Sequence, residues 1–416
     1  MIPAIVERCA GIDVGKKFVV VCVMTGPASE EAHAEMRQFG TVRAELAGLR
    51  EWLKREGCTH VVMESTGCYW KPVLNVLEDD PEYPVGIVLA NPRQVKAITG
   101  HKTDPHDARW LAHLLRHGMI RPSFIPPRAL RDLRDYTRRR KQIIGAAAQE
   151  RNRVQKLLED ANVKIGDVLS DVFGLSGQLM LEALVEGKTP TLGIAQLAKG
   201  HARKKIAELQ AALEGHQMRP VHRSLIRHAM EHMAFLAREV ESLDQEIEDL
   251  IRQAELTTSY QLLQTIPGIR ETAAAAILAE SGPDMKPFAK PQNFSSWSGV
   301  APGNNQSAGI RKRAPTMKGN PHIKAALVES GWSASRTKGS EFQDRYDRIK
   351  GRIGHKRAIV AAARLLALQV YRVLGTQQPY QPSRPEFQVR DLKRLRRHHS
   401  RRLKSIDRWL KNQELL

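Results

Sequence analysis

Few features of a secreted or membrane-spanning protein appear in this sequence. Only four of its 416 residues are cysteines: Cys9, Cys22, Cys58 and Cys68. They show neither the density of a disulfide framework nor the paired spacing of a zinc site. No apolar run approaches the roughly 20 residues that a membrane span requires. The N-terminal stretch MIPAIVERCAGIDVGKK lacks the hydrophobic segment of a signal peptide. We therefore expect free thiols in a reducing cytoplasm, and no membrane partner.

Acidic residues are too few to balance the basic ones. The chain has 65 lysines and arginines against 45 aspartates and glutamates, a formal charge of +20 and a sequence pI near 10.0. Such an excess attracts polyanions. Nucleic acid is the first candidate, because each phosphate that a cation neutralises releases condensed counterions.

The first third of the chain alternates short apolar runs with helical patterns. Residues 11–24 predict a hairpin around a Gly-Lys-Lys turn, and a third extended piece is expected near 37–43. A helical stretch and the buried-type strand THVVMESTG come next. A helix around 69–78 and a strand over 84–90 follow. Three strands followed by alternating helices and strands predict a mixed sheet covered by helices.

Four carboxylates stand out in this region. Asp13 and Glu64 occupy strand positions from which their side chains can converge on one edge of the sheet. Asp104 and Asp107 are three residues apart on a predicted helix and therefore share a face. Gathered carboxylates repel one another unless hard cations bind between them. Magnesium, often as a pair of ions, is the usual means of cutting a phosphodiester with such ligands.

Each of these acids also has a simpler interpretation. Asp104 precedes Pro105, which is typical of a helix N-cap, and Asp107 would then sit where the helix dipole favours an acid. Asp13 would be a turn residue, and Glu64 a solvated strand end.

Three segments carry a resemblance to a known family. GIDVGKK, VVMESTGCYW and HKTDPHDARWLAHLL resemble, in order, the acidic motifs of DEDD-type insertion-sequence transposases of the insertion-sequence one-ten family. The resemblance implies an α/β RNase H-like (RuvC-like) N-terminal domain. It also implies Mg²⁺ or Mn²⁺ as cofactor, bound by catalytic acids at Asp13, Glu64, Asp104 and Asp107.

The middle of the chain predicts two long helices. The first, over 128–160, is strongly basic. A solvated face is the default interpretation of such charge, but the shortage of acids in its first half favours phosphate contacts. The second, over about 219–255, has an apolar heptad seam from Leu236 to Leu250. Two alternatives stay open for this seam: a dimer partner, or an antiparallel pair with the first helix. The family's coiled-coil region favours assembly.

The segment LLQTIPGIRETAAAAILAESG, residues 262–282, is typical of a helix-hairpin-helix. Backbone N–H groups at its turn, around Gly268 and Arg270, would hold a phosphate without reading sequence. The alternative is an ordinary helical hairpin in the core.

A single serine, Ser307, lies among glycines and cations in PGNNQSAGIRKRAPTMKGN. Serine is a poor nucleophile unless a base takes its proton or cations hold the attacked group, so the residues alone favour a plain phosphate-binding loop. However, the surrounding pattern resembles the family's C-terminal transposase domain, whose serine forms a covalent phosphoserine with DNA. Ser307 falls on that position, whereas Ser295, Ser296 and Ser298 fit the pattern less well.

These observations divide the chain into four predicted parts. They are a RuvC-like DEDD domain (1–125), a helical coiled-coil region (126–257), a mostly helical C-terminal transposase domain (258–376) and a basic tail (377–416). The residues expected to contact nucleic acid are Lys16, Lys17, Lys102, Arg138, Arg139, Arg140, Lys141, Gly268, Arg270, Arg311, Lys312, Arg313 and Lys318.

The expected function is that of a transposase that cleaves and rejoins DNA in the cytoplasm, associated with the nucleoid. The family implies donor and target DNA, a guide-type non-coding RNA and a homo-oligomer, either dimer or tetramer. Two alternatives remain. One is a metal-dependent junction-resolving nuclease in which Ser307 only binds phosphate. The other is a non-catalytic DNA-binding protein whose acids are helix caps.

Overall fold

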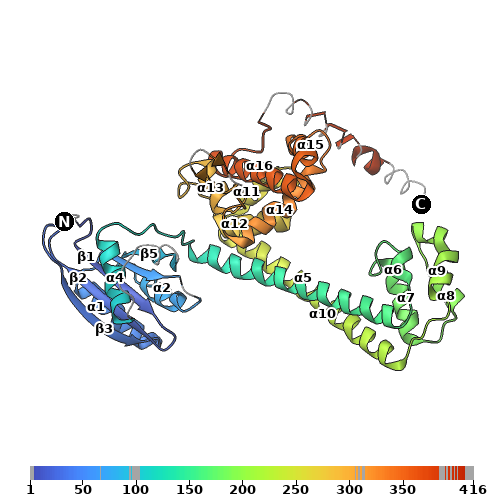
Figure 1. The fold of residues 1–416 in the computed structure, drawn as a ribbon, viewed down its shortest axis with the longest axis horizontal. Coiled ribbons are helices and arrows are strands. Elements are labelled where there is room, and N and C mark those ends of the chain that lie inside the picture. Colours follow the sequence, from blue (N-terminus) through green and yellow to red (C-terminus); the bar gives the residue numbers. More distant parts are fainter. Residues whose placement is uncertain are drawn as a thin grey trace. The chain divides into compact units, whose positions relative to one another are not determined.

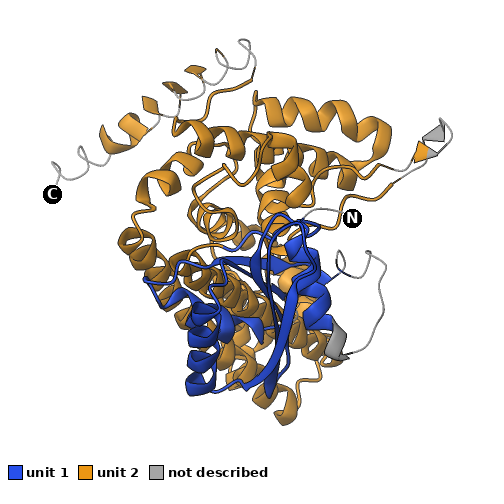
Figure 2. Ribbon diagram, turned by 90° about the vertical axis from the view of Figure 1, so that its left-hand side faces the viewer, with its two compact units in different colours: residues 1–125 blue, residues 126–416 orange. Residues whose placement is uncertain are grey.

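The structure, a computed structural model, divides the chain into two compact units, residues 1–125 and 126–416 (Figures 1 and 2). It describes residues 4–65, 67–92, 95, 104–304, 306–307, 310–311, 314–383 and parts of 389–407. Only the backbone is described at 104–106, 307 and 310–311.

Unit 1 is built on a five-stranded mixed sheet, as the sequence predicts. The sheet order is β3-β2-β1-β4-β5. β1 pairs antiparallel with β2, and β2 with β3, whereas β1–β4 and β4–β5 are parallel. The strands are β1 (Arg8–Val14), β2 (Phe18–Thr25), β3 (His33–Gly40), β4 (His60–Glu64) and β5 (Gly86–Ala90). The third strand begins earlier than the expected 37–43, because eight residues of β3 pair along the whole of β2.

Helices cover both faces of this sheet. On one face, α1 (Arg43–Arg55) and α2 (Trp70–Glu78) enclose a core with Ile12 and Met63. On the other face, α4 (Asp104–Arg116) packs on Cys9 and Val62. Alternate strand residues point to opposite faces, so odd-numbered residues of β1 and even-numbered residues of β4 face α4.

The cysteines are free, as expected. Cys9, Cys22 and Cys58 are buried in unit 1, and Cys68 is exposed. Burial raises the pKa of the Cys9 and Cys22 thiols to about 11. These two thiols are therefore inert core residues near neutral pH.

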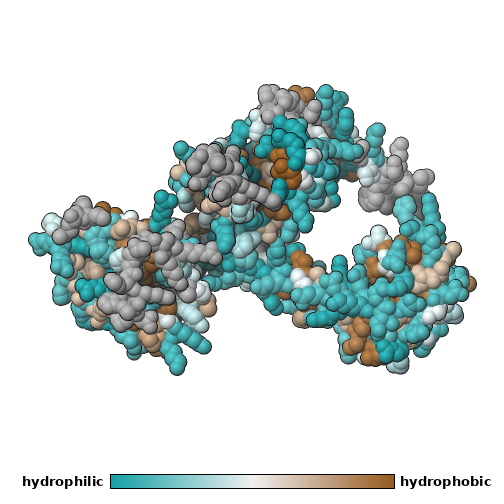
Figure 3. Space-filling model, viewed as in Figure 1, coloured by the Kyte–Doolittle hydropathy of each residue, from teal (hydrophilic) through white to brown (hydrophobic). Residues whose placement is uncertain are grey.

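Unit 2 begins with two long helices, α5 (Arg128–Asp160) and α10 (Pro220–Gln253), which pack along each other. Their side-chain contacts run in opposite directions: Arg140 meets Asp244, Glu150 meets His232, and Asp160 meets His222. The pair is therefore antiparallel within one chain, which was one of the two alternatives for the heptad seam. Its face seen in Figure 3 is mostly hydrophilic.

Short helices close the end of this pair where α5 ends and α10 begins. They share a core with Val154, Leu158 and Ile226. They are α6 (Ile165–Val168), α7 (Leu175–Glu186), α8 (Thr191–Gln196), the 3₁₀ helix Gly200–Lys205 and α9 (Ile206–Leu213).

The remaining helices pack around α16 (His355–Thr376), whose Leu366 and Val370 are fully buried in a common core. They are α11 (Thr257–Gln264), α12 (Glu271–Ser281), α13 (Pro291–Trp297), α14 (Pro321–Ser335) and α15 (Glu341–Ile353). Two short strands, β6 (Gln306–Ser307) and β7 (Ile310–Arg311), project from the segment between α13 and α14.

The expectation that no segment is long and apolar enough to cross a membrane was wrong for α16. Among the described residues, this 22-residue helix meets the criterion by length and composition. The reason is physical: a helix that packs on several sides needs as many apolar residues as a membrane span. Because α16 lies at the centre of a helical core, it is weak evidence for a span.

Candidate active site

Strand register brings Asp13 and Glu64 together in unit 1. In the parallel pair of β1 and β4, Cys9 lies opposite His60 and Ile12 opposite Met63. The next step of this register sets Asp13 beside Glu64, at the C-terminal ends of neighbouring strands about 4.8 Å apart. Both residues are partly buried, and both lie on the face covered by α4.

The first turn of α4 reaches the same edge of the sheet. Arg116 O accepts hydrogen bonds from the backbone near the start of β1, and Cys9 Sγ contacts Ala112 O at 3.6 Å. A Cβ on Gly11 would lie 2.2 Å from Ala108 O, so only glycine allows α4 to approach here. As the residue numbers rise along β1, the residue numbers of the contacting positions on α4 fall, so the two elements run in opposite directions.

Continuing this sequence of contacts places the start of α4 at the end of β1 that holds Asp13. α4 begins at Asp104, so Asp104 and Asp107 lie in its first turn. Asp107 is partly exposed, whereas the side chain of Asp104 lies outside the described part of the structure. The strand register thus sets Asp13 beside Glu64, and the direction of α4 places its first turn, with Asp107, toward the same strand ends. That these acids form one site stays a prediction.

The donor set matches the expected ion in kind. Carboxylate oxygens are hard ligands of the type that Mg²⁺ and Mn²⁺ take. Within the described residues, no three histidine, cysteine or acidic side chains stand close enough to hold a metal ion.

Two exposed lysines follow the acidic edge in the turn between β1 and β2. Lys16 and Lys17 are anchored through their carbonyls, which accept hydrogen bonds from Thr41 at 3.0 and 3.3 Å. Their ammonium groups are therefore free to extend from the end of β1 that carries Asp13. Lys102 lies outside the described residues.

Ser307 occupies a β-hairpin in unit 2. Its backbone pairs with Ile310 in the β6–β7 ladder, and the bridge between Pro302 and Thr316 continues the same antiparallel arm. Ser307 is therefore at the end of the arm distant from the helices. The side chains of Ser307 and Arg311, like Lys312 and Arg313, lie outside the description, whereas Lys318 near the base is exposed.

The base of this hairpin explains the glycines that flank it in the sequence. A Cβ on Gly319 would lie 2.2 Å from Trp297 O and 2.4 Å from the nitrogen of Gly299, whose φ of +71° also favours glycine. Asn320 donates its backbone N–H to Trp297 O and accepts one from His322, which caps α14. The two ends of the arm are thus clamped to each other and to a helix.

Two neighbouring serines are excluded as nucleophiles by burial. Ser295 and Ser298 are fully buried, and their hydroxyls donate to the carbonyls of Gln292 and Phe294 at 3.0 and 2.8 Å. Ser296 is partly exposed but belongs to α13. The choice of Ser307 as the nucleophile stays a prediction.

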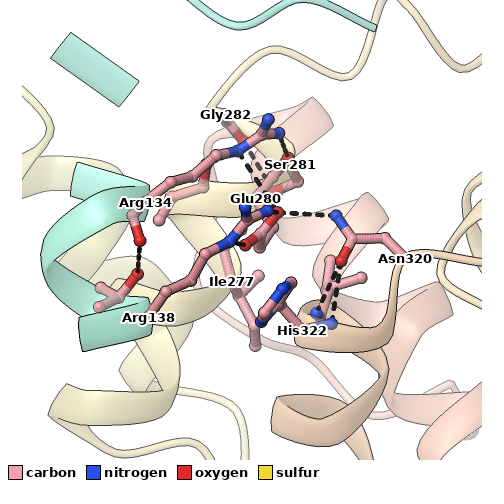
Figure 4. A network of polar contacts seen from close by, with 11 residues as sticks. Arg134, Arg138, Ile277, Glu280, Ser281, Gly282, Asn320 and His322 are labelled. Carbon is pink, nitrogen blue, oxygen red and sulfur yellow. Dashed lines mark hydrogen bonds and ion pairs between the residues drawn. The ribbon is translucent and has the colours of Figure 1, made fainter. Parts of the chain in front are cut away.

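A buried carboxylate, Glu280 of α12, contacts side chains of α5 and of the residue that precedes α14 (Figure 4). Its side chain is 2% exposed. It accepts two hydrogen bonds from Arg138 at 2.8 and 2.9 Å and one from Asn320 at 2.6 Å, and Arg134 lies 3.3 Å away. Burial alone would raise the pKa of Glu280, but Arg138 and Arg134 hold it below its ordinary value. Burial also lowers the pKa of Arg134 to about 10.

Two further cations of α5 are paired within the chain. Arg140 binds Asp244 of α10, with one contact at 2.9 Å, and Lys141 binds Glu329 of α14 at 3.1 Å. Among the described residues, only Arg139 of the four consecutive cations has no carboxylate partner. Nucleic-acid contact by these residues stays a prediction, because three of them join helices of unit 2.

The turn before α12 has a packing reason for its glycine. Gly268 has φ +89°, and a Cβ there would lie 2.5 Å from Ser330 O of α14. This agrees with the core helical hairpin that the sequence left open, while phosphate binding stays a prediction. Arg270 is exposed at the start of α12, on a cavity of about 500 Å³ that Arg138, Arg140 and Lys141 also line.

Comparison with known proteins gives two family matches. A family model described as a transposase, of the DEDD type found in IS110 elements, matches residues 10–163. A second, described as the transposase IS116/IS110/IS902 family, matches residues 260–347. No curated protein matches the chain.

Two solved structures are similar to the N-terminal part. Thermus thermophilus RuvC is 16% identical, covers 28% of this chain and 100% of its own, and has a TM-score of 0.23. T. thermophilus RuvC in complex with a Holliday junction substrate is 17% identical, with coverages of 28% and 99% and a TM-score of 0.22.

Proposed function

Because this chain belongs to the IS116/IS110/IS902 family of transposases, we propose that it cleaves and rejoins DNA with metal-bound acids and a serine nucleophile. The observation that supports the proposal is the register of β1 and β4, which sets Asp13 beside Glu64, together with the direction of α4, whose first turn carries Asp107.

The acids of unit 1 would hold the cofactor. A pair of Mg²⁺ or Mn²⁺ ions would stabilise charge on the attacking and leaving oxygens of a phosphodiester. Asp13 and Glu64 offer oxygens from two neighbouring strands, and Asp107, with Asp104, offers oxygens from a helix. Lys16 and Lys17 beside them would bind flanking phosphates of the DNA.

Ser307 would be the nucleophile. A bond forms between its Oγ and phosphorus while the bond from phosphorus to one deoxyribose oxygen breaks. The hydroxyl proton passes to a base, and the released oxygen takes up a proton. Attack of another strand's hydroxyl on the phosphoserine would then restore a phosphodiester and free Ser307. The cations that follow it in the sequence, Arg311 to Arg313, would stabilise the charge on the phosphoryl group.

The partners follow from the charge of the chain together with its family. A formal charge of +20 suits donor and target DNA and a structured guide-type RNA, whose backbones need cationic support whatever their sequence. We extend the proposal to a cytoplasmic homo-oligomer.

Replacing one acid tests the metal site. Asp13→Asn should lower strand cleavage by about 10²–10⁴-fold, because a lost ligand removes several kcal/mol of charge stabilisation. The assay uses a plasmid carrying the DNA that flanks the coding sequence, with its transcript and Mg²⁺. The control Glu82→Gln changes an exposed acid just before β5, at the N-terminal end of that strand and away from the C-terminal strand ends that carry Asp13 and Glu64. Cleavage by Asp13→Asn at the control's rate would refute the metal site.

Replacing the serine separates a transposase from a resolving nuclease. Ser307→Ala should bind the same DNA and RNA as the wild type but leave no protein–DNA adduct on denaturing gels. Ser296→Ala, which alters the partly exposed serine of α13, is the matched control. Undiminished adduct with Ser307→Ala would remove Ser307 from the mechanism. Cleavage without any adduct, in both proteins, would favour a nuclease that uses water.

A further inference from the structure

A cluster of aromatic rings lies on the surface of unit 2, where α14, α15 and α16 meet. The rings of Trp332 and His355 stand perpendicular, with centroids 4.5 Å apart, and the ring of Tyr346 stands perpendicular to that of His355, with centroids 5.6 Å apart. Tyr346 Oη is hydrogen-bonded to His355 Nδ1, which fixes both rings. Trp332 is 38% exposed and is the most exposed of the described tryptophans.

Cations cover the rings of this cluster. The guanidinium of Arg336 lies 5.2 Å from the centre of the Trp332 ring, and the ammonium of Lys350 lies 5.5 Å from that of Tyr346. Rings needed only for stability would be buried in the core, as Phe294 and Phe342 are. A ring left in solvent beside a guanidinium is instead the arrangement on which unpaired bases stack.

The surroundings are strongly basic. Residues 336–357 contain eight lysines and arginines against three acids. One of these acids, Glu341, is buried, and a second, Asp344, pairs with Arg348. Within the part of the chain that the structure describes, Arg348 is the one cation of this stretch with a carboxylate partner, and the exposed cations without one include Lys338, Arg352, Lys356 and Arg357.

The start of α16 adds to this charge. Its first turn carries His355, Lys356 and Arg357, where a helix usually favours acids, and no side chain caps it. Three basic residues at the positive end of a helix repel one another and the helix dipole. An approaching phosphate would relieve that repulsion.

We propose that this surface binds an unpaired nucleotide of single-stranded nucleic acid, with its base stacked on Trp332 and its phosphates held by the neighbouring cations. The site needs neither the acids of unit 1 nor the hydroxyl of Ser307. It therefore stands apart from the cleavage chemistry proposed above. RNA and single-stranded DNA share the base and the phosphate, and the experiment separates them.

The test measures binding of short unpaired oligonucleotides to the full chain without divalent metal. Fluorescence anisotropy compares an oligouridylate and an oligothymidylate of about 12 nucleotides with a duplex of the same length. Trp332→Ala should weaken single-strand binding about 5- to 150-fold and leave duplex binding unchanged, because only a free base can stack. Trp332→Phe, which keeps a ring face, should retain most of the affinity. Phe235→Ala, which removes an exposed ring of α10, is the control.

A second readout locates the base directly. An oligonucleotide that carries 5-iodouracil should crosslink to Trp332 or Tyr346 under ultraviolet light, as mass spectrometry of the peptides would show. If Trp332→Ala weakens binding of the oligouridylate alone, the site binds RNA. If it weakens binding of both oligonucleotides, the site accepts RNA and single-stranded DNA alike. Unchanged single-strand binding by Trp332→Ala, or an equal loss for the duplex, would overturn the proposal.

Discussion

The carboxylates of the two units are held in opposite ways. Asp13, Glu64 and Asp107 are partly exposed and lie where two neighbouring strands end and a helix begins. Glu280 is alone, 2% exposed and surrounded by cationic and amide donors. A carboxylate whose charge is matched inside the fold supports that fold. The acids of unit 1 would instead bind a cation, as proposed above, and we expect them to contribute less to the free energy of unfolding.

The largest effect on stability should come from Glu280. Glu280→Gln leaves two partly buried arginines without their counter-charge, and breaking such a pair costs about 3–5 kcal/mol of the free energy of unfolding. Glu64→Gln, at a partly exposed strand end, should change it by less than about 1 kcal/mol. Urea denaturation followed by circular dichroism measures both. Equal losses would show that Glu64 contributes as much to the free energy of unfolding as Glu280 does.

The strands that end at Asp13 and Glu64 could be predicted from the sequence, whereas the buried network could not, because its partners lie far apart along the chain. Asp13 and Glu64 converge because each ends a strand, which local apolar patterns reveal. The partners of Arg138 and Lys141 lie 142 and 188 residues away, so a count of acids along α5 finds too few. Four cations of α5 pair with acids of other helices, while its contact with phosphate stays a prediction.

The same contrast applies around the serine. Glycines and cations mark the hairpin in the sequence, but nothing local shows that Ser295 and Ser298 are buried or that Gly319 crosses Gly299. Those facts depend on how α13 and α14 pack. The surface at Trp332 was missed because Trp332, Tyr346 and His355 come from three helices, and each ring is close in sequence only to the cation beside it.

Acid should weaken the buried network next. The pKa of Glu280 in the folded chain lies below its ordinary 4.5, so its contribution is complete above about pH 4.5 and is lost as the pH falls through the folded value. Burial and Arg138 likewise lower the pKa of His322 from 6.5, so its contribution to stability is also lost as the pH falls, beginning at about pH 6.5. Unfolding free energies measured from pH 7 downward should therefore fall steadily. The curve of Glu280→Gln should be flatter below about pH 4.5, and a curve parallel to the wild type would contradict the network.

The smallest effect is expected where an α5 cation pairs at the surface. Arg140→Gln removes a contact with Asp244, whose side chain is 44% exposed. The side chain of Arg140 is 14% exposed, but water screens the carboxylate of Asp244 and each side chain loses freedom on pairing, so we expect a contribution of about 0–1 kcal/mol. Added salt should shrink the difference from the wild type further. Arg139→Gln is the matched control, because this neighbouring arginine is exposed and has no carboxylate partner among the described residues. A loss of unfolding free energy with Arg140→Gln as large as that with Glu280→Gln would contradict the idea that burial of the carboxylate decides how much its ion pair stabilises the fold.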